Sequence, residues 1–262
     1  LNDGFFIARM VVYFVIWSAI ALFYLRTSVG QDSTGDVKAT VRMQTFSGPS
    51  VVLYALTVAM AGFDVLMSLE PAFYSTMFGV AFFAGAIVSF FALMPLAIVS
   101  LQITGRVTQA VTTEHFHDLG KLTFGFVVFW AYINFSQFML IWYANIPEET
   151  IWYVMRVRDG WALPAVFLLF GHFVLPFFAM ISRWVKRNRI LLGMCCAWVL
   201  AMHYLDLYWL VMPSIDPLRV PVSLMDLTTM VGVGGLWVAM ATVWLRRSSL
   251  VPVKDPRLDE SL

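Results

Sequence analysis

Residues 119–150 read LGKLTFGFVVFWAYINFSQFMLIWYANIPEET, and this stretch decides the fold class of the chain. An apolar run long enough to cross a bilayer becomes rich in aromatic residues toward its end and stops at Pro147, just before Glu148 and Glu149. Aromatic residues are typical of the membrane–water interface, and the acidic pair marks the return to water. The stretch therefore predicts a membrane-spanning helix.

One side of this predicted helix is polar near its middle. At helical spacing that side carries Trp130, Asn134, Gln137 and Ile141. An amide without a hydrogen-bonding partner is costly inside a bilayer. Two interpretations follow: Asn134 and Gln137 bond to a neighbouring helix, or they line a polar path or contact a ligand.

The composition of the whole chain agrees with a membrane environment. Hydrophobic residues make up 60%, charged residues 13%, and the mean hydropathy is +0.79, whereas charged residues make up about a quarter of a soluble domain. The formal net charge of +1 gives no reason to expect a nucleic-acid partner. We expect an all-α polytopic membrane protein whose main surroundings are the lipid bilayer.

Cysteine and histidine spacing does not predict a metal site. The adjacent Cys195 and Cys196 have no second cysteine pair with which to complete a ligand set, so packing is the expected role. His115 and His117 are two residues apart, a spacing that points them to different sides of a helix. We therefore expect no bound metal.

Apolar segments separated by polar ones predict seven spans in antiparallel bundles and a polar tail over residues 246–262. The spans are expected near residues 4–25, 49–69, 74–103, 120–145, 161–184, 190–211 and 221–245. A polar segment, 27–47, is expected between the first two, and a loop over 147–160. Because the chain starts at Leu1 and an apolar segment follows almost at once, we also expect an N-terminal part to precede it.

The positive residues predict an orientation. Most of the 17 Lys and Arg residues fall on the side of the C-terminus, which the positive-inside rule makes cytoplasmic. Ionisable residues inside spans then lie mostly in the outer half of the membrane, where each is costly and indicates a function by default. These residues are Arg9, Asp64, His203, Asp206 and Asp226.

A proton half-path is the functional hypothesis. It would have His172 and His203 near its inner end, Asp206 and Asp64 as carriers, and Asn134 or Gln137 as fixed hydrogen-bonding groups. Pro176, four residues after His172, frees the backbone carbonyl of His172 and predicts a kink there. The alternative is a set of structural pairs, such as Asp206 with Arg9 or with His203.

A second use of the histidines is open. His172 and His203 lie on consecutive antiparallel spans at similar depth, so they could be the axial ligands of one b-type haem.

Several stretches together resemble one family. They are FFIARMVVYF at Phe5–Phe14, FDVLMSLEPAFYSTMFG at Phe63–Gly79, HDLGKLTFGF at His117–Phe126, FWAYINFSQFMLIWYANIPEET at Phe129–Thr150 and HFVLPFFAMISRWVKR at His172–Arg187. The chain resembles the second quinone-type (F-type) membrane subunit of alternative complex III, the bacterial quinol:cytochrome c oxidoreductase. This subunit is a relative of the NrfD-like, polysulfide-reductase-like membrane subunits. Val65 departs from the pattern, since the family usually has Trp there.

The resemblance implies a helical-bundle subunit of the bacterial inner membrane that itself binds no haem. Its partners would be a homologous NrfD-like membrane subunit, an iron–sulfur subunit, c-type cytochrome subunits and a terminal oxidase. The c-haems and iron–sulfur clusters would belong to those partners. Family members are described as quinone-binding, but the paired homologue is the better candidate for quinol oxidation. This subunit would scaffold the complex and supply a proton path through Asp64, Glu70, His172, His203 and Asp206.

Two other function classes remain open. A proton-coupled secondary transporter would also bury carboxylates, although such proteins usually have internally repeated halves and broken helices at matching positions, which these seven spans do not show. A purely structural anchor would need none of the buried acids.

Overall fold

The computed structural model describes residues 2–107 and 110–258. The described residues are 83% helical and contain no strand. Among them, seven helical segments are long and apolar enough to cross a membrane: Asp3–Thr34, Val37–Leu69, Thr76–Ile103, Thr113–Ala144, Asp159–Ile181, Arg189–Ser214 and Leu224–Leu245. The chain is an all-α polytopic membrane protein, as its apolar runs predict.

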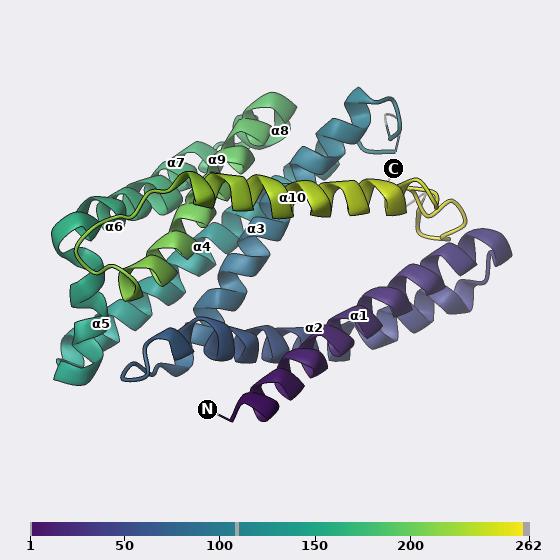
Figure 1. The fold of residues 1–262 in the computed structure, drawn as a ribbon. Helices are drawn as coiled ribbons and strands as arrows, with labels where there is room; N and C mark the ends of the chain where they lie inside the picture. Colours follow the sequence, from purple (N-terminus) through teal and green to yellow (C-terminus); the bar gives the residue numbers. More distant parts are fainter. Residues whose placement is uncertain (1, 108–109, 259–262) are drawn as a thin grey trace. The chain divides into compact units, whose positions relative to one another are not determined.

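Figure 1 shows the helices in chain order. The long ones are α1 (Asp3–Thr34), α2 (Val37–Val65), α3 (Thr76–Ile103), α4 (Thr113–Ala144), α9 (Arg189–Val211) and α10 (Leu224–Leu245). The fifth span is built from η2 (Asp159–Trp161), α6 (Ala162–Leu168), the π-helix η3 (Leu169–Val174) and α7 (Leu175–Ile181). Shorter helices are η1 (Met67–Leu69), α5 (Pro147–Val157), α8 (Arg183–Arg187) and η4 (Met212–Ser214).

The chain divides into two compact units. Unit 1 comprises Leu1–Tyr54 and Pro221–Leu262, and unit 2 comprises Ala55–Val220. Unit 1 therefore holds α1, the first part of α2, and α10, and unit 2 holds everything between. The division into one membrane domain over residues 1–245 and a polar tail over residues 246–262 remains a prediction. The last four residues of that tail lie outside the described residues.

Within unit 1, helices continue through the polar segment that the sequence predicts between the first two spans. Helix α1 ends only at Thr34, and Gly35 makes the turn with a left-handed φ of 69°. Gln31 on α1 donates from Nε2 to Thr40 Oγ1 on α2 at 2.7 Å. Local helix propensity and this buried hydrogen bond thus extend both helices beyond their apolar parts.

Unit 2 is a bundle whose core lies where α3, α4, α7 and α9 meet. Small and β-branched residues let α3 lie close to its neighbours. The buried core consists of Ala84, Val88 and Ala92 on α3, Phe116, Val127 and Trp130 on α4, Met180 on α7, and Leu192, Cys196 and Val199 on α9. Cys196 is fully buried there, in keeping with the packing role expected for it.

The predicted loop 147–160 is largely helical. Helix α4 ends at Asn145, which has a left-handed φ of 50°, and Pro147 then takes the first position of α5. Glu148 and Glu149 in the first turn of α5 and Arg156 in its last turn complement the helix dipole. The proline thus starts a new helix as well as ending a span.

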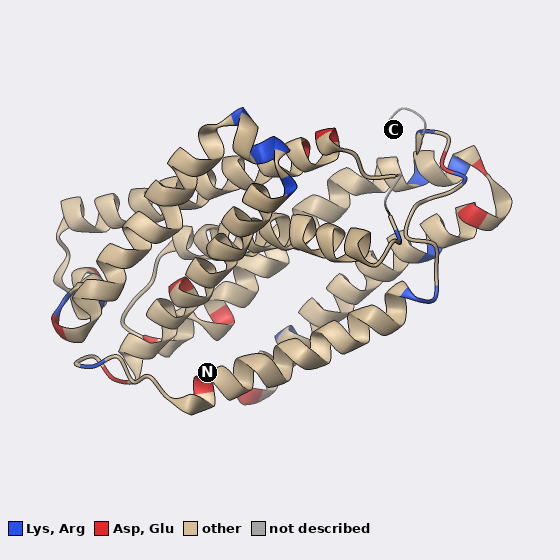
Figure 2. Ribbon diagram, turned by 90° about the horizontal axis from the view of Figure 1, so that it is seen from above, with Lys and Arg blue, Asp and Glu red and all other residues tan. Residues whose placement is uncertain are grey.

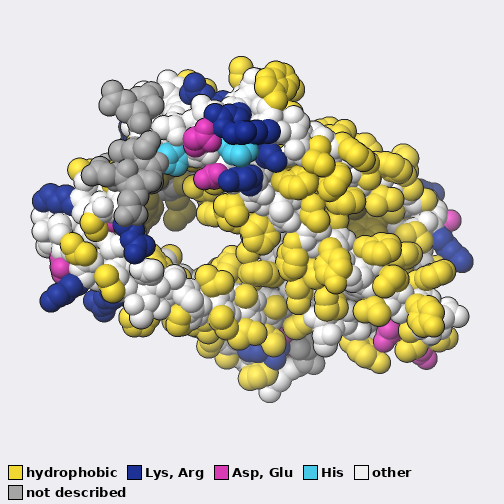
Figure 3. Space-filling model, turned by 180° about the vertical axis from the view of Figure 1, so that it is seen from behind, with side chains coloured by type: hydrophobic (Ala, Val, Ile, Leu, Met, Phe, Trp, Pro, Cys, Tyr) yellow, Lys and Arg dark blue, Asp and Glu magenta, His cyan; other side chains and the backbone are white. Residues whose placement is uncertain are grey.

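The outer surface matches a lipid environment. In Figure 2 the ribbon is mostly tan, and the blue and red residues gather largely at helix ends. Figure 3 shows broad yellow apolar surface on one face. Large apolar side chains such as Phe178, at 67% exposure, and Tyr143, at 85%, point outward. Exposed apolar surface of this extent is favourable in a bilayer and unfavourable in water.

Candidate functional site

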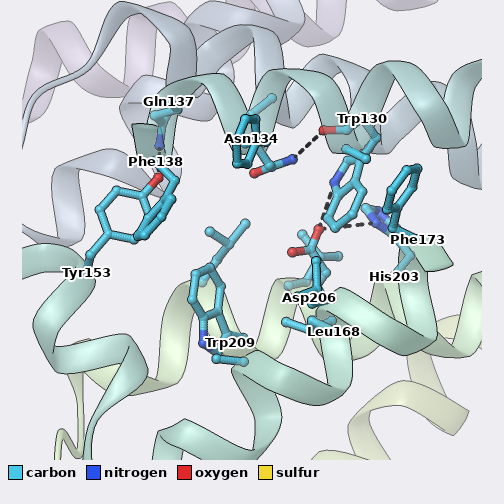
Figure 4. A pocket seen from close by; sticks show the side chains of 18 of the residues that line it. Trp130, Asn134, Gln137, Phe138, Tyr153, Leu168, Phe173, His203, Asp206 and Trp209 are labelled. Atoms are coloured by element: carbon cyan, nitrogen blue, oxygen red, sulfur yellow. Dashed lines mark hydrogen bonds and ion pairs between the residues drawn. The ribbon is translucent and has the colours of Figure 1, made fainter. Parts of the chain in front are cut away.

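A cavity of about 610 Å³ lies within unit 2. Its walls come from α3, α4, α5, α6, η3 and α9, and most of them are aromatic or aliphatic side chains. Figure 4 shows its polar side chains, which include Asn134, Gln137, His203 and Asp206. An apolar cavity with a few converging polar groups is the usual form of a ligand or substrate site.

Asp206 is the centre of the polar wall. The indole Nε1 of Trp130 on α4 donates to Asp206 Oδ2 on α9 at 3.2 Å. His203, one turn earlier on α9, places Nδ1 3.7 Å from the same oxygen. The Asp206 residue is only 6% exposed, so these two neighbours provide most of the polar surroundings of the carboxyl group. The predicted structural pair of Asp206 with His203 is present in this arrangement.

His172 lies behind Trp130. The two ring centroids are 3.9 Å apart, and the centroid of the His203 ring is 5.9 Å from that of His172. The His172 side chain is fully buried, and neither ring nitrogen has a hydrogen-bond partner among the described residues. His172, Trp130, His203 and Asp206 thus form one contiguous group, which we call the Asp206 cluster.

The π-helix η3 positions His172. This wider helical turn begins seven residues before Pro176, and Trp198 Nε1 on α9 donates to the Gly171 carbonyl at 2.8 Å. Helix irregularities of this kind often occur at functional sites because they reorient side chains. Pro176 predicts a kink at His172, and the structure has a π-helix at that place.

The two amides on α4 have different roles. Gln137 donates from Nε2 to Tyr153 Oη at 3.2 Å, and its Oε1 accepts from Ser75 Oγ at 3.3 Å. Asn134 donates from Nδ2 to the Trp130 carbonyl, one turn back on the same helix, at 2.9 Å. Gln137 therefore joins α4 to its neighbours, as the structural interpretation predicts, whereas Asn134 bonds within α4 and lines the cavity.

The other predicted site residues lie outside the Asp206 cluster. Asp64 and Glu70 are partly buried near the end of α2 and after η1, and neither lines the cavity. Arg9 and Asp226 belong to unit 1, where Asp226 Oδ2 accepts from the Ser223 backbone N–H at 3.0 Å and caps α10. A capping role accounts for the position of Asp226 near the start of its span.

Arg156 is the residue that sequence reasoning missed most clearly. The sequence places it in a polar loop, yet its side chain is 1% exposed. It donates to the carbonyls of Trp152 and Leu210 and to Ser214 Oγ, and its guanidinium lies 3.8 Å from the centre of a Trp152 ring. Burial lowers the pKa of Arg156 to about 10, so the side chain stays charged at neutral pH.

Trp130 and Tyr153 complete the site in ways that their spacing alone does not reveal. Trp130 falls on the polar side of α4 in the sequence, but its bond to Asp206 depends on how α9 packs. Tyr153 is partly buried against Gln137, and burial raises the pKa of its hydroxyl to about 12. In the sequence, the only feature that points to these two residues is an aromatic residue next to polar ones within a span or at its end.

The position of His172 bears on the haem hypothesis. Trp130 covers the His172 ring, and His172 is not among the residues that line the cavity. Of the two predicted axial ligands, only His203 therefore lines the cavity. Within residues 2–107 and 110–258, no group of three or more His, Cys, Asp or Glu side chains is arranged to hold a metal ion.

Comparison with known proteins does not assign the chain to a family. No protein-family model matches it, and the search of curated proteins found no similar sequence.

Proposed function

We propose that this chain is a membrane subunit of a quinol:cytochrome c oxidoreductase of the alternative complex III type, where it scaffolds the complex and provides part of a proton path linked to quinol oxidation. Two independent lines support the proposal. One is the resemblance of the five quoted stretches to that family. The other, which carries the most weight, is a buried carboxylate, Asp206, held by an indole N–H beside two imidazoles at the wall of an apolar cavity.

The chemistry of the Asp206 cluster suits proton transfer. A carboxylate and an imidazole both take up and release protons in a range that a membrane enzyme can use. The 3.7 Å separation of His203 and Asp206 is longer than a hydrogen bond, so a proton passes between them after a small rotation of the imidazole or through one bridging water. The indole N–H of Trp130 does not ionise near neutral pH, so Trp130 orients Asp206 and carries no proton itself.

The remaining members of the proposed path within unit 2 are Asp64 and Glu70. In this proposal they carry protons between the Asp206 cluster and the aqueous surface. The expected partners, a homologous membrane subunit, an iron–sulfur subunit and c-type cytochromes, hold the redox centres.

Quinone binding by this chain is a second candidate role, favoured by the cavity itself. A cavity of about 610 Å³ with aromatic walls and a few polar groups at its edge is suited to a ring that carries carbonyl or hydroxyl groups. A proton-coupled transporter would use the same carboxylate. The cofactors that co-purify with the chain, and whether proton movement accompanies quinol oxidation, therefore have to distinguish an oxidoreductase subunit from a transporter.

The test begins with the native protein purified in mild detergent. We expect c-haem and iron–sulfur subunits to co-purify and a reduced-minus-oxidised spectrum without b-haem assignable to this chain. The complex is then reconstituted in liposomes, where quinol oxidation and proton movement are measured together. Purification of a lone, colourless chain would contradict the oxidoreductase proposal and favour a transporter.

The Asp206→Asn variant tests the carrier role. Asparagine keeps an oxygen that accepts from Trp130 but does not ionise, so we expect proton-coupled turnover to fall about tenfold or more while the complex still assembles. Glu148→Gln is the matched control, because Glu148 is exposed on α5 and undergoes the same loss of charge. If the Asp206→Asn complex has the same turnover and the same proton coupling as the unmodified complex, Asp206 is not a proton carrier.

A further inference from the structure

A group of charged residues lies where α8 packs against the first turns of α4. We call it the α4–α8 cluster, and its members are the cations Lys121, Arg183, Lys186 and Arg187 and the carboxylates Glu114 and Asp118. Figure 3 shows Lys, Arg and His side chains gathered with carboxylates at one edge of a largely apolar face. Nothing in the proposed proton path uses these residues.

Two of the four cations are neutralised within the cluster. Arg187 lies 2.6 Å from Glu114 Oε1, and Lys121 lies 2.6 Å from Asp118 Oδ1. Among the described residues, no carboxylate lies within 4.0 Å of Arg183 or Lys186. Within residues 2–107 and 110–258, two positive charges of the cluster therefore have no carboxylate partner.

Lys186 is unusual because it is buried as well as unpaired. It is 9% exposed, and a Cβ placed on Gly120 would lie 3.0 Å from Lys186 Cγ, so the lysine stem packs directly on α4. Its ammonium nitrogen is 5.2 Å from the centre of the Phe124 ring. Burial, and then the charge of Lys121, lower the pKa of Lys186. The stem is therefore buried while the ammonium end stays accessible, where it can attract an anion.

Arg183 and Lys186, the two cations outside these ion pairs, both act on His117. The charges of Lys121, Arg183 and Lys186 all act on the ring of His117, which lies one turn before Lys121 on α4. Arg183 and Lys186 are also three residues apart on α8, a spacing that puts both on one face of the helix. An anion beside that face would contact both.

The cluster lies at the boundary between membrane and water. Helix α8 connects the end of one span, at Ile181, to the start of the next, at Arg189. Trp184 is 68% exposed and Ile190 is 74% exposed, so apolar side chains flank the cations. Tryptophan is typical of the headgroup level of a bilayer, where lipid phosphates lie.

We propose that the α4–α8 cluster binds the phosphate group of an anionic membrane phospholipid, with Arg183 and Lys186 in contact with the phosphate and Trp184 beside the acyl chains. The flanking apolar side chains favour a lipid over a free phosphate ion, which would gain nothing from them. The proposal does not depend on the proton path or on the identity of the complex.

The test measures lipid retention by native mass spectrometry. The full chain, in its native complex, is stripped of lipid in detergent and incubated with phosphatidylglycerol or with zwitterionic phosphatidylcholine. We expect selective retention of phosphatidylglycerol, weakened about five-fold by Arg183→Gln and again by Lys186→Met. Arg183 is exposed, and methionine keeps the packed stem of Lys186, so both variants should fold.

Lys38→Gln is the matched control, because Lys38 is exposed at the start of α2 and the substitution removes the same charge. We expect this variant to retain phosphatidylglycerol as the unmodified chain does. The proposal is overturned if Lys38→Gln weakens retention as much as Arg183→Gln does, if both lipids are retained equally, or if millimolar inorganic phosphate displaces the lipid completely.

Discussion

His203 reaches the side of Asp206 because the residue facing it on α3 has no side chain. A Cβ placed on Gly85 would lie 2.7 Å from His203 Cε1. Two non-bonded carbon atoms cannot lie this close, so either the His203 ring or α3 would have to shift. Gly85 lies inside a helix, where glycine costs stability relative to alanine. Glycine at position 85 therefore lowers the stability of α3 but allows the imidazole of His203 to approach closely.

The Gly85→Ala variant tests this reading. We expect it to destabilise the chain by about 1–3 kcal/mol, because His203 or α3 must shift, and to lower proton-coupled turnover. Thermal unfolding in detergent measures the first effect. Gly193→Ala on α9 is the control: its Cβ would meet Leu96 Cδ2 at an ordinary 3.7 Å, so we expect unchanged or slightly higher stability. Equal effects of the two substitutions would contradict the close-packing argument.

The hydroxyl of Tyr153 ionises at a higher pH than an ordinary tyrosine because the side chain is largely removed from water. Burial raises its pKa to about 12 from the ordinary 10.0, outweighing the hydrogen bond from Gln137, which acts in the opposite direction. The folded state therefore favours the protonated phenol. Its contribution to stability is fully present below pH 10 and is lost as the pH rises through 12.

Alkaline titration of tyrosinate absorbance checks this value. We expect the difference between the unmodified chain and Tyr153→Phe to emerge near pH 12, well above the titration of a free tyrosine derivative. Circular dichroism confirms that the chain is still folded at each pH. A difference that emerges near pH 10 would show that the Tyr153 hydroxyl is solvated.

At the scale of elements, α5 is held to the end of α9 largely by one residue. Arg156 donates to the Leu210 carbonyl and to Ser214 Oγ, while Trp209 Nε1 donates to the Arg156 carbonyl at 2.9 Å. Carbonyls near the end of a helix lack partners within the helix, and the guanidinium supplies one. The contact fixes a short helix that also provides Trp152 and Tyr153 to the cavity wall.

Replacing Arg156 by methionine should loosen α5. We expect a loss of about 2–4 kcal/mol, because buried carbonyls lose a charged donor and Trp152 loses its stacked partner. Thermal unfolding and limited proteolysis between α4 and α6 provide the measurement. Arg158→Met serves as the control, since Arg158 is exposed two residues further on and should be nearly neutral when replaced. If both variants behave alike, Arg156 does not anchor α5.

Helix-scale expectations succeeded where they depended on local pattern. The amides of α4 lie on its polar side, and the irregular turn lies just before Pro176. The pattern could not tell that Gln137 would be a link between helices and Asn134 a cavity residue, because that depends on which neighbours pack there. It likewise missed the burial of Arg156, since an amphipathic 11-residue helix and a charged loop have similar compositions.

At the scale of the whole molecule, the number of spans predicts on which side each loop lies. Three candidate spans separate α5 from the polar segment after α10, so we expect the two regions on opposite sides of the membrane. In this predicted topology most Lys and Arg residues fall on the side of the C-terminus, which we expect to be cytoplasmic.

Cysteine labelling in whole cells checks this topology. Single cysteines are introduced as Glu148→Cys and Lys254→Cys in a chain whose Cys195 and Cys196 are alanine. We expect a membrane-impermeant maleimide to label the first in intact cells and the second only after permeabilisation. Labelling of both from the same side would mean that an even number of spans separates them.

The sequence by itself determined that this protein is helical, crosses the membrane several times and carries ionisable groups within its spans. These properties follow from local composition and periodicity, because a bilayer forces apolar helices on any chain that crosses it. Only the tertiary structure decided which polar groups meet. Asp206, Trp130 and the two histidines come from α9, α4 and η3, and packing at positions such as Gly85 sets their distances.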